Sequence, residues 1–342
     1  MSGPSVRAEP DLLVVGAGPT GIAIGAEAKR RGLDPLLVDR GPLTAAIQDY
    51  PAHLRFFTTR DRLEIADVPF TVPEDKPSRR QALVYYRSVA ERWGLPLALH
   101  EEVTAVVPPG EPGGRFEVTT RHRAEARRYR PRAIAVASGY FGNPKRLGVP
   151  GEDLPWVGDR YRDPYRHFGE RVAIVGAGNT AAEAALDLWR NDVRVTLVHR
   201  GHEVKGSVKY WLKPDFDNRV AEGSIAARYG SCVTAFREEG AERWLELVPA
   251  AGGGEPERLP CDAAYVFIGY RPDMSLLSAA GVTVDPETLV PAHDPETGES
   301  NVPGLYVAGT LQAGAATDRI FIENSREHAP KIAAHLAARL GR

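Results

Sequence analysis

The sequence predicts an α/β fold with two Rossmann-like dinucleotide-binding domains, the second inserted into the first. Two observations carry this prediction. An apolar run leads into G-x-G-x-x-G at Gly16, Gly18 and Gly21, and a similar run leads into G-x-G-x-x-A at Gly176, Gly178 and Ala181. The interval from Gly16 to Asp39 equals the interval from Gly176 to His199, so strand, loop, helix and strand recur in register. Such a loop, opening a helix directly after a strand, is the pattern of a dinucleotide site.

In the first copy, DLLVV and PLLVD are expected strands on either side of a helix from Gly21 to Arg31. Gly16 permits a tight turn, Gly18 lets a pyrophosphate approach the backbone, and Gly21 lets helix and strand pack closely. The helix N-terminus presents unpaired N–H groups to the phosphates. Asp39 at the end of the second strand is placed to accept a hydrogen bond from a ribose hydroxyl. The neighbouring loop and strand-end residues expected at this site are Pro19, Thr20 and Arg40.

The second copy differs at the end of its second strand, where His199 and Arg200 replace the carboxylate. A carboxylate favours a free 2′-hydroxyl, whereas a cationic pair favours the 2′-phosphate of NADP. The sequence therefore predicts FAD at the first site and NADPH at the second. Asn179 and Thr180 follow Gly178 in the second loop and are expected to contact the nucleotide; Lys205 and Lys209 could add positive potential.

The rest of the chain is divided by prolines and glycines. We expect a helix over 80–93, a hairpin formed by 103–107 and 116–120, a buried strand ending at Gly139, another ending near Gly309, and a terminal helix including 331–340. The proline- and glycine-rich segment 141–155 reads as an interdomain connection. The predicted domains are 1–153 and 271–342 for FAD, with 154–270 between them for NADPH.

The bulk composition limits the classes of partner. The 342 residues have a formal charge of -2, which gives no general attraction for nucleic acid or an anionic membrane. The chain shows no apolar run of the ~18 residues that a membrane helix needs, and its start lacks a signal-peptide core, so a cytoplasmic protein is expected. Cys232 and Cys261 form no C-x-x-C pair, and no metal-like cluster is present in the sequence.

The order of motifs along the chain resembles that of the two-domain flavoprotein disulfide reductases of the thioredoxin-reductase type. The motifs are A-S-G at 137–139, G-V-P-G-E at 148–152, I-G-x-x-P at 268–272 and G-L-Y-x-A-G at 304–309, around the two glycine loops. The resemblance implies that Ser138, Gly139, Gly309 and Thr310 surround FAD and that Gly269 lies near the nicotinamide. It also adds Val103 and Ile320 to the expected cofactor-binding residues.

A narrower resemblance rests on four blocks that are not generic to nucleotide-binding folds. They are YPAHLRFFTTRDRLEIADVPF, KPSRRQALVYYRSV, SVKYWLKPDFDNRVAEGSI and RIFIENSREH. These blocks resemble the bacillithiol disulfide reductases of the YpdA type, which bind FAD and use NADPH. The implied function is hydride transfer from NADPH to FAD, followed by reduction of a low-molecular-weight disulfide such as bacillithiol disulfide. A homo-oligomer is expected by analogy alone.

Two departures from these families keep other functions open. Thr20 stands where the compared family members carry a cysteine, and a hydroxyl cannot enter thiol–disulfide exchange. Thr310 stands where an aspartate is usual. The alternatives are a reductase of ferredoxin, flavodoxin or quinone, a redox-sensing FAD- and NADPH-binding protein, and a flavin monooxygenase. Trp156 and Arg162 break the F-x-G-x-x-x-H motif of that last class. No catalytic acid or base is assigned.

Overall fold

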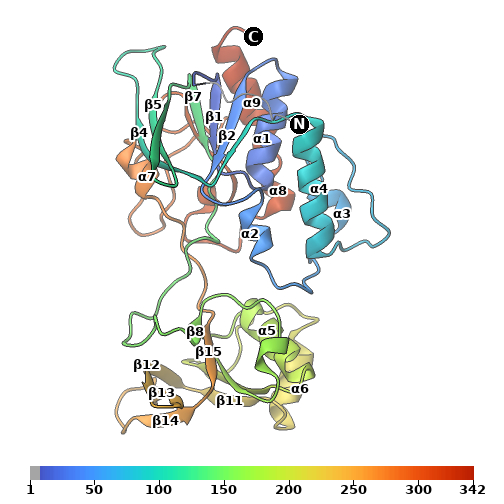
Figure 1. Cartoon of the computed structure of the whole chain (residues 1–342), viewed down its shortest axis with the longest axis vertical. Coiled ribbons are helices and arrows are strands. Elements are labelled where there is room, and N and C mark those ends of the chain that lie inside the picture. The colour runs from blue at the N-terminus through green and yellow to red at the C-terminus, as the bar shows by residue number, and fades with distance from the viewer. Residues whose placement is uncertain (1–7) are drawn as a thin grey trace. The chain divides into compact units, whose positions relative to one another are not determined.

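The computed structural model describes residues 8–342, which form two parallel sheets with helices packed beside them (Figure 1). The contacts divide the chain into two compact units. Unit 1 runs up to Asp49 and includes His53–Asn143 and Arg271–Arg342; unit 2 comprises Tyr50–Ala52 and Pro144–Tyr270. The α/β class predicted from the sequence is confirmed.

Unit 1 is built on a five-stranded parallel sheet in the order β16-β7-β1-β2-β3. These strands are β1 (Leu12–Val15), β2 (Pro35–Asp39), β3 (Leu97–Leu99), β7 (Ala133–Val136) and β16 (Leu305–Val307). A three-stranded antiparallel sheet accompanies it, formed by β4 (Glu101–Val107), β5 (Glu117–His122) and β6 (Glu125–Tyr129). Its β4–β5 pairing is the hairpin expected from the sequence.

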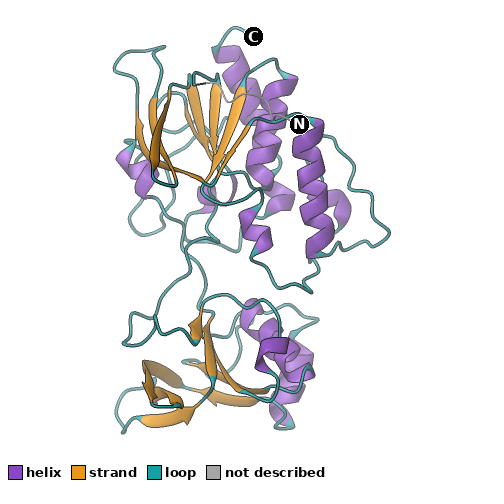
Figure 2. Cartoon of the chain, viewed as in Figure 1, coloured by secondary structure: helices purple, strands orange, loops and turns teal. Residues whose placement is uncertain are grey.

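Helices flank the parallel sheet of unit 1 (Figure 2). The long ones are α1 (Pro19–Arg30), α4 (Arg79–Arg92) and α9 (His328–Arg339), and α1 contacts both others. Short helices complete the unit: α2 (Ala45–Gln48), α3 (Arg60–Leu63), α7 (Ser275–Ala279), α8 (Ile322–Ser325) and the 3₁₀ turn η2 (Gly309–Ala313). A capping box formed by Ser78 and Gln81 begins α4, because each side chain bonds the other residue's backbone N–H.

Unit 2 repeats the plan with a five-stranded sheet in the order β11-β10-β9-β15-β8 and a three-stranded antiparallel sheet, β12-β13-β14. Its strands are β8 (Val157–Gly158), β9 (Arg171–Val175), β10 (Arg194–His199), β11 (Ala226–Tyr229), β12 (Ser231–Glu239), β13 (Glu242–Pro249), β14 (Glu257–Pro260) and β15 (Ala263–Val266). Its helices are α5 (Asn179–Arg190), α6 (Lys213–Ala221) and the 3₁₀ turn η1 (Tyr165–His167).

The central strand β9 is buried on both faces, as a parallel strand between two layers must be. Val172 and Ile174 belong to the cluster that contains the α5 residues Ala181 and Ala185. Ala173 and Val175 belong to the opposite cluster, with Val233 and other residues of the antiparallel strands. Successive side chains of a strand point to opposite faces, which explains this division.

The boundary between the units at Asn143 and Pro144 lies before the predicted boundary at residue 153. The reason is that the connection packs as part of unit 2. Leu147 and Val149 pack against the buried cluster that contains Phe236, and Glu152 accepts hydrogen bonds from the backbone N–H groups of Leu147 and Gly148. Composition identified a connecting segment but could not show which core its leucine and valine side chains join.

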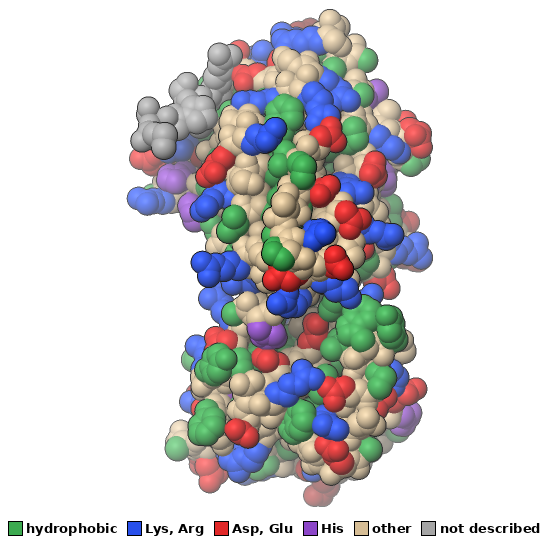
Figure 3. Space-filling model, turned by 90° about the vertical axis from the view of Figure 1, so that its right-hand side faces the viewer, with side chains coloured by type: hydrophobic (Ala, Val, Ile, Leu, Met, Phe, Trp, Pro, Cys, Tyr) green, Lys and Arg blue, Asp and Glu red, His purple; other side chains and the backbone are tan. Residues whose placement is uncertain are grey.

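Surface charge is mixed on the face seen in Figure 3, where Lys and Arg side chains alternate with Asp and Glu. Within residues 8–342, no helix is long and apolar enough to cross a membrane. The expectation that the chain start lacks an export signal falls mainly on residues 1–7, which lie outside the described part.

Candidate dinucleotide-binding sites

The first glycine loop forms an open cradle at the carboxyl end of β1. Gly16 has a φ of +112°, and a Cβ there would lie 2.5 Å from the carbonyl oxygen of Ala137. A Cβ at Gly21 would lie 1.9 Å from the carbonyl oxygen of Gly16, so helix and loop touch. A Cβ at Gly18 would meet nothing within 4 Å. The two outer glycines therefore permit close packing, while Gly18, the N-cap of α1, leaves open space in front of the helix N-terminus.

Asp39, at the end of β2, holds this loop in shape. Its Oδ2 accepts a hydrogen bond of 2.7 Å from the N–H of Ala17, and its Oδ1 accepts one of 2.7 Å from the N–H of Gly41. The carboxylate therefore lies directly beside the cradle. Arg40 next to it is exposed, with its Nη2 3.5 Å from the carbonyl oxygen of Gly142.

The structure brings Ser138, Gly139, Gly309 and Thr310 to the same edge of the sheet, because β16, β7 and β1 are neighbours. A Cβ at Gly139, in the loop that contains Ser138, would lie 3.8 Å from Oγ1 of Thr310. A Cβ at Gly309 would lie 3.2 Å from Oγ1 of Thr20. The carboxyl edge of a parallel sheet is where such folds bind ligands.

Thr20 lies in the first turn of α1, after Pro19, and makes a polar contact with the C-terminal helices. Its Oγ1 is 3.0 Å from Oγ of Ser325, which is buried. Val103 lies on β4 and packs against the core that contains Val15 and Val38, while Ile320 lies half-buried just before α8.

The second glycine loop repeats this geometry at the carboxyl end of β9. Gly176 has a φ of +130°, and a Cβ there would lie 2.2 Å from the carbonyl oxygen of Phe267. A Cβ at Gly178 would meet nothing within 4 Å. Ala181 is fully buried against the sheet, so the methyl group at the third position is accommodated. Gly269, which follows the adjacent strand β15, has a φ of +99° with open space around its Cα.

Asn179, expected from the sequence to contact the nucleotide, forms hydrogen bonds with the segment 205–209. Its Oδ1 accepts a 2.9 Å hydrogen bond from the N–H of Lys209, and its Nδ2 is 3.5 Å from the carbonyl oxygen of Ser207. The N–H of Lys205 also donates to the carbonyl oxygen of Ala177 in the loop, at 3.0 Å. Asn179 thus connects the segment 205–209 to the second glycine loop. The next residue, Thr180, is exposed.

A pocket of about 610 Å³ opens at the end of β10. It is lined by the end of β10 and the loop after it, by Cys232 of β12 and by the residue after β13: His199, Arg200, Gly201, Lys205, Cys232 and Ala250. Burial, and then the charges of Lys205 and Arg200, lower the pKa of His199. At neutral pH the positive charge of the pocket therefore comes from Arg200 and Lys205, which differs from the cationic His199–Arg200 pair expected from the sequence.

The two cysteines both lie in unit 2 and differ in environment. Cys261 is buried, and burial raises the pKa of its thiol to about 12, which keeps it protonated and unreactive. Cys232 is half-buried and lines the pocket beside Arg200.

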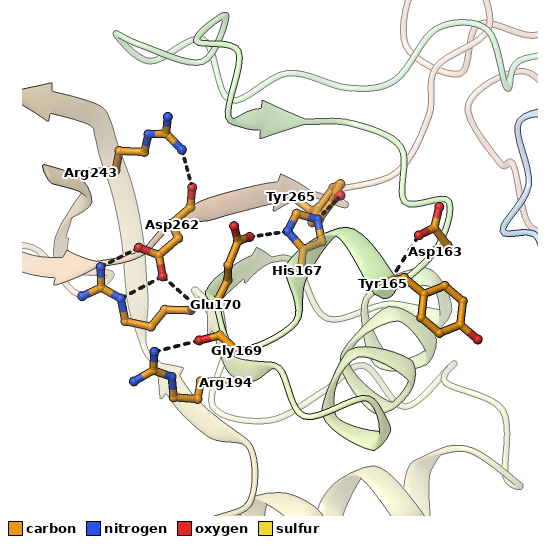
Figure 4. Close-up of polar contacts among 10 residues, drawn as sticks. Asp163, Tyr165, His167, Gly169, Glu170, Arg194, Arg243, Asp262 and Tyr265 are labelled. Atoms are coloured by element: carbon orange, nitrogen blue, oxygen red, sulfur yellow. Dashed lines mark hydrogen bonds and ion pairs between the residues drawn. The ribbon is translucent and has the colours of Figure 1, made fainter. Parts of the chain in front are cut away.

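A polar cluster that the sequence did not indicate lies at the opposite, amino-terminal end of β9 (Figure 4). The buried imidazole of His167 bridges Oε2 of Glu170 at 2.7 Å and the hydroxyl of Tyr265 at 2.8 Å. Arg171 binds Asp262 through two guanidinium nitrogens, and this contact lowers the pKa of Asp262 to about 2. Because ligands bind at the other edge of such sheets, we interpret this cluster as structural.

Ser325 and His328 make contacts to the expected site residues Thr20 and Gly309 that the sequence did not predict. Both belong to RIFIENSREH, a block that the family resemblance identified without giving these residues a role. The N–H of Gly309 donates a 3.1 Å hydrogen bond to Nδ1 of His328.

Comparison with known proteins gives consistent results. Residues 13–309 match the family described as pyridine nucleotide-disulphide oxidoreductase. The chain is 35% identical to the bacilliredoxin reductase Bdr of Bacillus subtilis (strain 168) over 327 residues, covering 96% of this chain and 97% of that protein. It resembles the structure of the bacillithiol disulfide reductase Bdr (YpdA) from Bacillus cereus with a TM-score of 0.90 and 34% identity, covering 97% of this chain and 99% of that one. For the corresponding protein from Staphylococcus aureus, the TM-score is 0.87 and the identity 33%, with coverages of 97% and 99%.

Proposed function

The chain belongs to the pyridine nucleotide-disulphide oxidoreductase family, and from this premise we propose that it is an NADPH-dependent FAD enzyme that reduces bacillithiol disulfide. Membership makes the chain an NAD(P)H-dependent flavoprotein oxidoreductase. The observation that supports the two cofactors is the pair of glycine cradles, each at the carboxyl edge of its own parallel sheet, with opposite charge at the two strand ends. The substrate is proposed from the similarity along nearly the whole chain to the bacillithiol disulfide reductases Bdr (YpdA).

We assign FAD to unit 1. The open space before Gly18 suits a pyrophosphate, which the N-terminus of α1 attracts through its unpaired N–H groups. Asp39 lies beside that space, and its remaining lone pairs can accept hydrogen bonds from ribose hydroxyls. A carboxylate there would repel a 2′-phosphate, so this cradle favours the ADP half of FAD.

We assign NADPH to unit 2. The open space before Gly178 suits the second pyrophosphate, and the pocket with Arg200 and Lys205 follows on the ribose side, at the end of β10. A guanidinium binds a phosphate through two parallel hydrogen bonds, and a lysine adds a point charge. The remaining residues predicted from the sequence stay in the proposal as cofactor-binding residues, with His199 as a neutral member of the pocket and Asn179 as the residue that positions the segment 205–209.

The overall reaction consumes NADPH, one proton and one disulfide, and it yields NADP⁺ and two thiols as the S–S bond breaks. When bound, the flavin supplies the conversion of a two-electron hydride donor into a reductant for the disulfide. The protein's residues bind and orient both cofactors. Thr20 offers no thiol at the first cradle, and Cys232 and Cys261 both lie in unit 2. We therefore propose that the substrate disulfide is reduced without a mixed disulfide at position 20.

We also propose that the enzyme works in the cytoplasm, where NADPH is regenerated.

The test is NADPH consumption by the purified FAD-loaded protein with bacillithiol disulfide as the varied substrate. We expect saturable turnover that is lost without the disulfide. Ferredoxin, flavodoxin and quinone acceptors serve as comparisons under the same conditions. Faster turnover with one of these acceptors, and none with the disulfide, would contradict the proposal.

A further inference from the structure

Two polar contacts connect the C-terminal helices to the edge of the sheet in unit 1. Ser325, the last residue of α8, contacts the hydroxyl of Thr20 through its Oγ at 3.0 Å. His328, the first residue of α9, accepts the N–H of Gly309 at its Nδ1 at 3.1 Å. Ser325 and His328 lie three residues apart and hold two segments that are distant in sequence, the first glycine loop and the turn after β16.

The turn that His328 holds has little freedom to move without disturbing the cradle. Gly309 has a φ of +68°, in the left-handed region, and starts the 3₁₀ turn η2. A Cβ on Gly309 would be within 3.2–3.5 Å of three side-chain atoms of Thr20. A rotation of the Gly309 peptide would therefore push against the first turn of α1, which closes the cradle.

Nδ1 of His328 can remain a hydrogen-bond acceptor for the N–H of Gly309 because the imidazole stays neutral. A backbone N–H can donate only to an unprotonated ring nitrogen, so the neutral imidazole carries its proton on Nε2. Burial, and then the neighbouring charges of His293 and Lys331, lower the pKa of His328 to about 4. The imidazole therefore remains neutral, and its Nδ1 remains an acceptor, throughout the physiological pH range.

We propose that His328 is a positioning residue of the FAD site, which holds the Gly309 turn against Thr20 and so keeps the cradle in the shape that binds FAD. This inference rests on the proposed function, since it presupposes FAD in unit 1. Removing the acceptor leaves the N–H of Gly309 without its half-buried partner and frees the turn. That loss is expected to weaken FAD binding by about tenfold, the equivalent of one hydrogen bond.

The experiment compares the affinity of the full-length apoprotein for FAD, measured by quenching of flavin fluorescence, in three forms. His328→Leu removes the acceptor and should raise the dissociation constant about tenfold. His328→Asn can place its Oδ1 where Nδ1 stands and should restore the affinity to within about threefold of the unaltered protein. Rescue by a neutral acceptor distinguishes positioning of the turn from a general effect on packing.

The matched control is His335→Leu on the same helix. Its Nδ1 lies 2.9 Å from the hydroxyl of Tyr306 on β16, so this variant also breaks a contact between α9 and the last strand but leaves the Gly309 turn alone. We expect it to lower the melting temperature without weakening FAD binding. Equal affinity in His328→Leu and the unaltered protein, or failure of His328→Asn to rescue, would overturn the inference. Failure of the unaltered protein to bind FAD would instead overturn the proposed function.

Discussion

At the scale of single residues, the two cradles have the same glycine geometry and differ in the charge beside them. The first has Asp39, whose carboxylate is held by two backbone N–H groups. The second has Arg200 and Lys205 around an open pocket. Because the glycines shape both cradles alike, we propose that these charged side chains decide which nucleotide each cradle prefers.

Arg200→Leu should lower kcat/KM for NADPH by about 10- to 100-fold, the range for losing a charge-assisted phosphate contact, and change kcat/KM for NADH by less than about threefold. Steady-state rates with both nucleotides check this. Arg194→Leu is the matched control, because Arg194 lies at the other end of β10 and donates to the carbonyl oxygen of Gly169. An equal loss for NADH and NADPH would contradict a 2′-phosphate contact.

Thr20→Cys tests whether a thiol at the first loop would help. Since we propose reduction without a thiol there, this variant should change kcat/KM for the disulfide by less than about threefold. Mass spectrometry after incubation with the disulfide would report any mixed disulfide at position 20. A gain of more than about tenfold would show that the unaltered protein lacks a needed group.

At the scale of helices and strands, the sequence predicted what local pattern determines. The strands beside the two glycine loops, the hairpin β4–β5 and the helix α4 follow from apolar periodicity and glycine spacing. It could not predict the contacts of Asn179 with 207–209 or of Ser325 with Thr20. These join segments 28 or more residues apart, and a sequence pattern carries no distance between such segments. The position of the unit boundary depends in the same way on which core Leu147 joins.

Asn179→Ala should release the segment 205–209 from the start of α5. Because the N–H of Lys209 loses its partner and Lys205 is less well placed, we expect several-fold weaker NADPH binding, about 1 kcal/mol for one hydrogen bond. Hydrogen exchange at Lys209 should become faster in the same variant. Asn191→Ala, which removes a contact with the carbonyl oxygen of Asp187 at the other end of α5, should leave both quantities unchanged. Unchanged exchange at Lys209 in Asn179→Ala would contradict the assignment.

Glu183, in the second turn of α5, makes the stability of the protein depend on pH. Burial raises the pKa of its carboxyl to about 7 from an ordinary value of 4.5. The folded state therefore holds this proton more tightly than the unfolded state does, and the associated stability is lost as pH rises from 4.5 through 7. Glu183→Gln should remove this dependence and stabilise the protein at pH 8 by at most about 3 kcal/mol. Denaturant unfolding at pH 5 and pH 8 measures it, and an unchanged pH dependence in Glu183→Gln would contradict the prediction.

At the scale of the whole molecule, each unit has its own parallel sheet, its own buried core and its own cradle. In the proposed function, NADPH and FAD are thus each bound by a separate unit. The cysteines lie in the unit assigned to NADPH, and the unit assigned to FAD contains none. The central claim is therefore that an enzyme without a cysteine in its FAD unit reduces a disulfide.

One anaerobic titration tests this claim most directly. The FAD-loaded protein receives one equivalent of NADPH and then bacillithiol disulfide, while the visible absorbance of the flavin is followed. We predict that NADPH bleaches the flavin and that the disulfide restores its colour rapidly. A flavin that bleaches and then stays reduced in the presence of the disulfide would contradict the account and direct the search to other acceptors.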